Sequence, residues 1–306
     1  MFHPRLSKIK ALPTILLFTV AAIWGSGFIA SQIALDAHIS PALFMFVRFS
    51  LAAVIVLGIF WRQLREKMKR DDLKKGFFLG LLLFLAFYVQ IVGLQFTTPS
   101  NNAFLTSTNV VMVPFLWWAI SKKRPEGRVF LSSLLCLCGI GILSVNLTGG
   151  ISFSVGDLLT LACAFFFACQ IALTGKLAIE MDTAVLVFLQ FATAAVLSLL
   201  AFALTDRDFS GFTSASGMGA VLYLALFSTC LCYFLQTAVQ KYVTSSKAAI
   251  ILSTEALFGS LFSVLLGYDK LTVQMVLGGG IIILSLLLTE LSPRRKPDMS
   301  LCPPDK

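Results

Sequence analysis

The sequence predicts an all-α polytopic membrane protein with ten transmembrane helices, and three observations carry this prediction. Hydrophobic residues make up 58% of the chain and charged residues only 13%, against roughly 45–50% and 25% in soluble domains. The apolar residues form long runs that can cross a bilayer as helices, separated by short polar stretches. Lysines and arginines gather in alternate polar stretches, as the positive-inside rule expects.

The first apolar run is predicted to be a membrane span rather than a signal peptide. It exceeds the length of a typical signal core, and its removal would unbalance two similar halves of the chain. An even number of spans places both termini on one side of the membrane. The predicted spans are 12–34, 41–61, 75–94, 103–121, 128–146, 156–176, 183–204, 217–239, 247–267 and 273–290.

The distribution of basic residues predicts the orientation. With the N-terminus in the cytoplasm, 21 lysines and arginines fall inside and two, Arg207 and Lys270, fall outside, while Arg48 lies within a span. We therefore expect both termini in the cytoplasm and a multi-pass location in the cell membrane of a bacterium. The net charge of +9 is explained by these clusters, so it does not indicate a nucleic-acid partner.

The chain contains an internal repeat. Ser107-Thr108-Asn109 recurs 146 residues later as Ser253-Thr254-Glu255, and the same offset relates Gln90 to Gln236 and Asp36 to Asp182. We expect one five-helix repeat over 12–146, a second over 156–290 and a cytoplasmic tail over 291–306. Because five is odd, the second repeat must cross the membrane in the opposite sense. Inverted repeats are typical of secondary transporters, which bind their solutes near the bilayer midplane.

Glu255 is the strongest single candidate for function. A carboxylate at membrane depth costs roughly 2.5–3.5 kcal/mol or more, and such residues usually face a polar cavity. A low-dielectric setting favours the neutral acid, so Glu255 is also a candidate for proton coupling. The alternative is a structural acid that is permanently hydrogen-bonded.

Other polar residues within spans are candidates for the same cavity. Arg48 is a candidate anion contact, and its alternative is snorkelling towards the interface. Trp24 and Ser26 belong to a Trp-Gly-Ser-Gly stretch, which predicts either a kink that lines the cavity or close helix packing. The remaining candidates for substrate binding are Tyr88, Gln90, Asn109, Gln170 and Gln236.

Two other classes of protein fit the sequence less well. An intramembrane enzyme would need a base beside a nucleophile such as Ser26, but the two histidines, His3 and His38, fall outside the spans. A passive channel would need a continuous polar pore, whereas the polar residues are concentrated near the midplane. The sequence indicates no metal site and no cofactor. The expected partners are a small-molecule substrate, the lipid bilayer and, for a homodimer, a second copy of the chain.

Several short motifs in this order resemble the EamA family of the drug/metabolite transporter superfamily. The resemblance rests on Trp24-Gly25, Arg48-Phe49, Pro114-Phe115, Gly156-Asp157 and Glu255, followed by Leu266-Gly267-Tyr268-Asp269-Lys270-Leu271-Thr272. It covers about 12–290, although Ala256 stands where the family often has proline, and Tyr268-Asp269 where it has Gly-Glu. The resemblance implies a non-enzymatic transporter that exports small metabolites, such as amino acids or toxic drug-like compounds, by alternating access.

Overall fold

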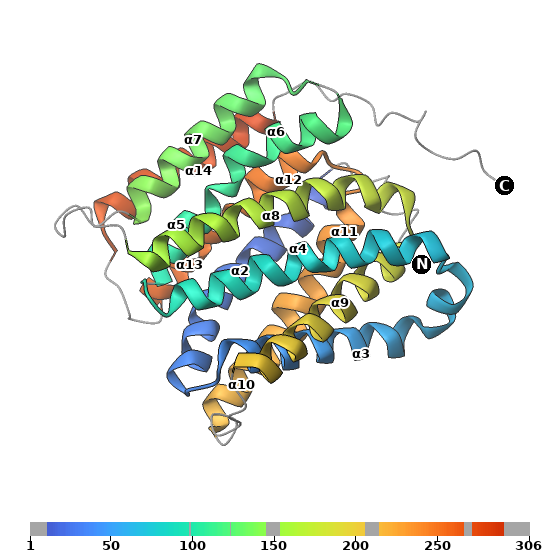
Figure 1. Ribbon diagram of the computed structural model, residues 1–306. Coiled ribbons are helices and arrows are strands. Elements are labelled where there is room, and N and C mark those ends of the chain that lie inside the picture. The colour runs from blue at the N-terminus through green and yellow to red at the C-terminus, as the bar shows by residue number, and fades with distance from the viewer. Residues whose placement is uncertain are drawn as a thin grey trace.

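The computed structural model describes residues 11–97, 99–122, 124–144, 154–205, 214–265 and 271–290. Within these ranges all the regular structure is helical, and the helices form one bundle (Figure 1). The predicted tail, Arg207, and residues 266–270 of the family-like motif lie outside the described residues.

The helices of the first half overlap the five predicted spans, and two shorter helices together cover the fourth. Seven helices in the described residues are long and apolar enough to cross a membrane, and α7 and α14 contain shorter apolar stretches. The prediction of a polytopic, all-helical protein is therefore confirmed. The first half contains α2 (Leu12–Asp36), α3 (Pro41–Lys67), α4 (Arg70–Leu94), α5 (Pro99–Ser107), α6 (Asn109–Ser121) and α7 (Gly127–Ser144).

The second half repeats the pattern of the first, with three long spans, two short helices and a final helix. Its third span contains one π-helical segment. That span consists of α10 (Ala215–Tyr223), the π-helix η2 (Leu224–Leu231) and α11 (Cys232–Val239). The other helices are α8 (Val155–Glu180), α9 (Thr183–Thr205), α12 (Ser245–Leu252), α13 (Glu255–Leu265) and α14 (Val273–Glu290).

Two predicted spans are broken helices in the structure. The range 103–121 is interrupted at Thr108, between α5 and α6, and the range 247–267 is interrupted at Ser253–Thr254, between α12 and α13. At each break a threonine hydroxyl donates to the carbonyl three residues earlier, from Thr108 to Leu105 and from Thr254 to Ile251, both at 2.6 Å. Such side-chain bonds to the backbone bend helices.

The predicted kink at Trp24-Gly25 is absent, because α2 is a continuous helix. Close packing, the alternative, is what the structure shows. A Cβ on Gly25 would lie 2.7 Å from both the carbonyl oxygen of Glu255 and the amide nitrogen of Gly259. The glycine therefore lets the backbone of α13 lie directly against α2.

The two halves of the chain pack against each other. Helix α3 lies along α9, α4 lies along α8 and α9, and α7 and α14 form a pair at one edge of the bundle (Figure 1). Arg48 is the only lysine or arginine in the described part of the chain that lies away from the ends carrying the α3–α4, α6–α7, α8–α9 and α11–α12 connections. We call this side of the bundle the basic end.

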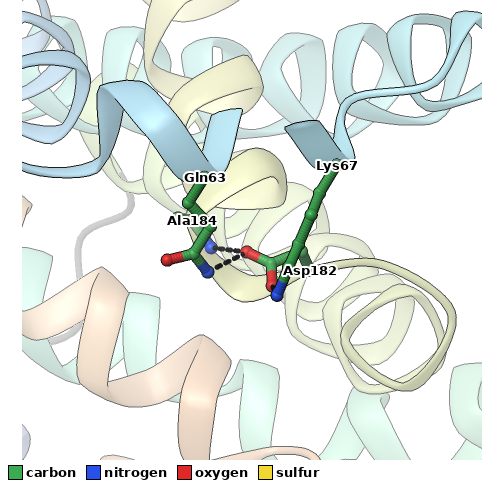
Figure 2. A network of polar contacts seen from close by, with 4 residues as sticks. All are labelled: Gln63, Lys67, Asp182 and Ala184. Atoms are coloured by element: carbon green, nitrogen blue, oxygen red, sulfur yellow. Dashed lines mark hydrogen bonds and ion pairs between the residues drawn. The ribbon is translucent and has the colours of Figure 1, made fainter. Parts of the chain in front are cut away.

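Ionic contacts join the two halves at the basic end. Asp182 accepts hydrogen bonds from Lys67 Nζ at 2.9 Å, Gln63 Nε2 at 2.7 Å and the backbone N–H of Ala184 at 3.0 Å (Figure 2). A second salt bridge joins Lys75 to Glu180 at 2.6 Å. These contacts fasten the start of α9 and the end of α8 to the first half.

Candidate functional site

A cavity of about 640 Å³, including space open to the outside, lies where the broken helices meet α2, α4 and α8. The lining residues of α2, α3 and α4 come from the halves of those helices remote from the basic end. The cavity therefore extends from the middle of the bundle away from the basic end. Six predicted site residues line it: Trp24, Arg48, Gln90, Asn109, Gln170 and Glu255.

Arg48 is held inside the bundle and does not snorkel, since its exposed fraction is 2%. Its Nη2 donates to Ser228 Oγ at 3.1 Å, and its Nε donates to Thr229 Oγ1. The guanidinium carbon also lies 4.3 Å from the ring centroid of Phe87, a cation–π distance. Two of the five guanidinium N–H groups are used in these bonds, so Arg48 retains donors for an anionic group.

The π-helix η2 is anchored to the first half at the cavity wall. The indole N–H of Trp24 donates to the carbonyl oxygen of Ser228 at 2.8 Å, in addition to the bonds from Arg48. The wider turn of a π-helix is frequently found at functional sites. In this chain it presents Leu224 and Ser228 to the cavity.

Aromatic rings form much of the remaining wall. Phe87 packs edge-on against Phe167 with the centroids 5.0 Å apart, and the rings of Trp24 and Tyr233 are 5.2 Å apart. All four residues line the cavity. Aromatic walls with a few polar groups are typical of sites that bind organic molecules.

The amide of Gln90 is fixed by neighbouring helices. Its Nε2 donates to Thr106 Oγ1 of α5 at 3.0 Å, and its backbone carbonyl accepts from Asn102 Nδ2 at 3.2 Å. Asn102 Nδ2 also reaches Thr160 Oγ1 of α8 at 2.9 Å. These bonds tie the broken helix α5 to both α4 and α8.

Glu255 and Asn109 begin the second segments of the two broken helices and both face the cavity. Their exposed fractions are 8% and 7%. Among the described residues, neither side chain has a hydrogen-bond partner, and no salt bridge joins Glu255 to Arg48. The cavity lining thus contains one carboxylate, one guanidinium and the neutral amides of Gln90, Asn109 and Gln170. Nowhere in the described ranges do three or more metal-ligating side chains come together.

Three of the predicted site residues do not line the cavity. The hydroxyl of Ser26 bonds to the Tyr223 hydroxyl at 2.5 Å, and Tyr88 stacks on Phe84 with the centroids 5.3 Å apart. Gln236 is completely buried beside the cavity, with an exposed fraction of 0%. The expectation that Gln236 would share a cavity with Gln90, Asn109 and Glu255 therefore fails for Gln236 alone.

Sequence reasoning missed the residues that form the walls, above all Phe87, Tyr233 and Ser228. Phe87 and Tyr233 are related by the same offset of 146 residues as Gln90 and Gln236, and each lies three positions before its glutamine. Helical spacing places such residues on one face. This periodicity would have selected them in place of their neighbours Tyr88 and Phe234.

The fold is that of a multi-pass membrane protein, and the cavity is its candidate site for a small molecule. A family model described as the EamA-like transporter family matches the chain in two stretches, residues 12–145 and 154–291. The chain belongs to the EamA-like transporter family, a branch of the drug/metabolite transporter superfamily, as the sequence motifs indicated.

Relatives of this chain are also described as transporters. An uncharacterized transporter of Archaeoglobus fulgidus is 35% identical over 272 residues, which cover 89% of this chain and 83% of the relative. The uncharacterized transporter YwfM of Bacillus subtilis is 27% identical over 181 residues, covering 59% of this chain and 60% of the relative. A solved crystal structure superposes with a TM-score of 0.78 at 17% identity, over 92% of this chain and 97% of the other, which supports the fold.

Proposed function

We propose that this chain is a secondary transporter that exports a small organic metabolite across the cell membrane by alternating access. The transported molecule is an amino acid or a drug-like compound that carries an amine. One observation carries this proposal: Arg48 and Glu255 line one cavity with aromatic walls, and among the described side chains neither forms a salt bridge. Buried charges are usually paired, so a solute with complementary charges fits this cavity.

The same cavity favours a solute with both an acidic and a basic group. The guanidinium of Arg48 suits a carboxylate, and Glu255 suits an ammonium group. Phe87, Phe167 and Trp24 supply contact area for an apolar or aromatic portion between them. A bound solute of this kind would replace the missing partners of both charges.

We further propose that residues 12–146 and 156–290 form two inverted five-helix repeats with both termini in the cytoplasm. The two separate family matches and the equivalent helix breaks support this arrangement. The basic end then faces the cytoplasm, and the cavity extends from the midplane towards the outside. Proton binding by Glu255 supplies the coupling, since the carboxylate lies at membrane depth in the cavity.

Thermal unfolding of the purified protein with a panel of amino acids, nucleobases, organic cations and drugs tests the proposal. Binding to the folded state raises the melting temperature as the ligand concentration rises. At a ligand concentration of 100 times Kd the folded state is more stable by about 2.7 kcal/mol. We expect stabilisation by zwitterionic compounds that is weaker in Glu255→Gln. Stabilisation that is unchanged in this variant would place the binding site elsewhere.

A passive facilitator is the alternative, and uptake into proteoliposomes separates the two. A secondary transporter accumulates the stabilising compound when a pH gradient is imposed, whereas a facilitator only equilibrates it. Equilibration without accumulation would contradict proton-coupled transport.

A further inference from the structure

A cluster of buried amides lies between the cavity and the basic end. Gln170 of α8 lines the cavity, and its Nε2 contacts Gln190 Oε1 of α9 at 3.4 Å and Thr174 Oγ1 at 3.1 Å. Gln240, just after α11, donates to the carbonyl oxygen of Ile171 at 3.0 Å. Gln236 lies one turn from Gln240 on the same face of α11. We call Gln170, Gln190, Gln236 and Gln240 the amide cluster.

The amide cluster is buried without enough hydrogen-bond partners. The exposed fractions of its four side chains are 0% or 1%. In the described part of the chain, both polar atoms of the Gln236 amide have no partner, and neither do Gln170 Oε1, Gln190 Nε2 and Gln240 Oε1. A buried polar atom without a partner costs about 1–3 kcal/mol, so a purely structural cluster of this kind would be unfavourable.

The amide cluster continues the lining of the cavity towards the basic end. On α11, Tyr233 lines the cavity and is followed on the same face by Gln236 and Gln240. On α8, Gln170 is followed by Thr174. The Ser245 hydroxyl, at the start of α12, lies directly against Gly175 of α8, where a Cβ would collide with it. Polar groups therefore extend from the cavity along the faces of three helices.

Gln236 and Gln90 occupy equivalent places in the predicted repeat but differ in surroundings. Gln90 lines the cavity and is hydrogen-bonded, whereas Gln236 is enclosed and unpaired. In secondary transporters built from inverted repeats, alternating access moves one repeat against the other. Such a movement would open the surroundings of Gln236 and enclose Gln90.

We propose that the amide cluster is a second binding site for the transported molecule, closed in this structure and opened towards the basic end in the alternate conformation. Its ligands are the carboxylate and ammonium groups of the solute, to which amides can both donate and accept hydrogen bonds. This inference rests on the proposed transport function and extends it to a cytoplasmic site. Salt bridges from Lys67 to Asp182 and from Lys75 to Glu180 join the two halves at the same end of the bundle.

The Gln236→Leu variant distinguishes an effect on transport from an effect on the stability of the fold. We expect Gln236→Leu to unfold at the same or a higher temperature, because it removes two unpaired polar atoms from a buried position. Uptake of a mixture of radiolabelled amino acids into proteoliposomes should fall at least tenfold. Gln274→Leu, on α14 and away from the cavity, should change neither property. Wild-type uptake by Gln236→Leu, or a loss of stability together with uptake, would overturn the inference.

Thiol labelling tests the opening without depending on the solute. Gln236→Cys and Val239→Cys are matched, since both positions on α11 are fully buried but Val239 packs in an apolar cluster. We expect a membrane-impermeant thiol reagent to modify the Gln236→Cys variant only from the basic end, and to leave Val239→Cys unmodified, as read by mass spectrometry of the peptide. Equal labelling of both variants, or none of Gln236→Cys, would overturn the inference. If wild-type vesicles take up no amino acids but Gln236→Cys is labelled selectively, the proposed substrate class fails and the opening stands.

Discussion

The two broken helices are alike in backbone structure and differ in charge. In both, a serine donates to the carbonyl four residues earlier, from Ser107 to Ala103 at 2.9 Å and from Ser253 to Ala249 at 2.8 Å. The residue after each break is Asn109 in one half and Glu255 in the other. The same local structure therefore breaks a helix beside the cavity in each half. Only the second half has an ionisable residue, Glu255, after the break. Helix breaking and charge are therefore separate properties of this motif.

The largest expected effect comes from removing the charge from the second copy. We predict that Glu255→Gln, which keeps the side-chain shape, lowers pH-gradient-driven uptake at least 100-fold, or about 2.7 kcal/mol. Asn109→Ala, at the equivalent position, removes a neutral hydrogen-bonding group and should lower uptake only about fivefold, as for a bond worth about 1 kcal/mol. Uptake of radiolabelled amino acids into proteoliposomes measures both.

Solute exchange in the absence of a gradient provides the control for Glu255→Gln. If Glu255 serves proton coupling rather than stability, the Glu255→Gln variant should still exchange the solute across the membrane, with a reduced affinity for that solute. Equal losses of gradient-driven uptake in Glu255→Gln and Asn109→Ala would show that the charge has no special role.

The neighbouring helices differ in how closely they approach the two breaks. Gly25 of α2 allows the backbone of α13 within contact distance, whereas α8 presents the buried Ala168 towards Val113 of α6 and Ala249 of α12. A Cβ at position 25 would have to displace backbone atoms, and overpacking of this kind costs about 1–3 kcal/mol. We predict that Gly25→Ala lowers the thermal stability of the purified protein by this amount.

Gly58→Ala is the matched control for this effect. Gly58 lies within α3, and a Cβ there would meet no atom within 4 Å. Alanine is favoured over glycine in a helix by about 1 kcal/mol, so Gly58→Ala should be neutral or stabilising. Equal melting temperatures for the two variants would contradict close packing between α2 and α13.

The helices could be predicted from the sequence, but the breaks in two of them could not. Long apolar runs and basic clusters located the spans because bilayer thickness and backbone hydrogen bonding dictate length and composition. The breaks at Thr108 and Thr254 depend on hydroxyl bonds to the backbone that compete closely with a straight helix. The hydropathy of a segment does not depend on these hydroxyl bonds, so it cannot predict the breaks.

The candidate site was predicted in part, and the residues that were misjudged depend on distant contacts. Glu255 and Asn109 were found because polar residues inside an apolar run are conspicuous. Arg48 was judged from its nearness to the start of α3, but its hydroxyl partners lie 180 and 181 residues away. The burial of Gln236 could not be inferred, because it follows from the packing of α11 against other helices, including α8 and α9.

The smallest expected effect concerns Asp36 and Asp182, the third pair related by the offset of 146 residues. Among the described residues, Asp36 accepts a side-chain bond only from Gln32 of its own helix, at 2.8 Å, whereas Asp182 joins the two halves at the basic end (Figure 2). Burial raises the pKa of Asp182, but the bonds from Lys67 and Gln63 outweigh it and hold the pKa below its ordinary value. We predict that Asp182→Asn lowers stability at neutral pH by about 1 kcal/mol or less, and Asp36→Asn by less still.

The pH dependence distinguishes the ionic contribution of Asp182 from a packing effect. A carboxylate whose pKa is lower in the folded state stabilises that state above its unfolded pKa of about 3.9. This contribution disappears as the pH falls through the lower, folded pKa. The difference in thermal stability between the wild type and Asp182→Asn should therefore be constant near neutral pH and shrink below about pH 4. A difference that persists in acid would show that the Asp182→Asn substitution disturbs the turn between α8 and α9, and that the two halves are not held together there by charge.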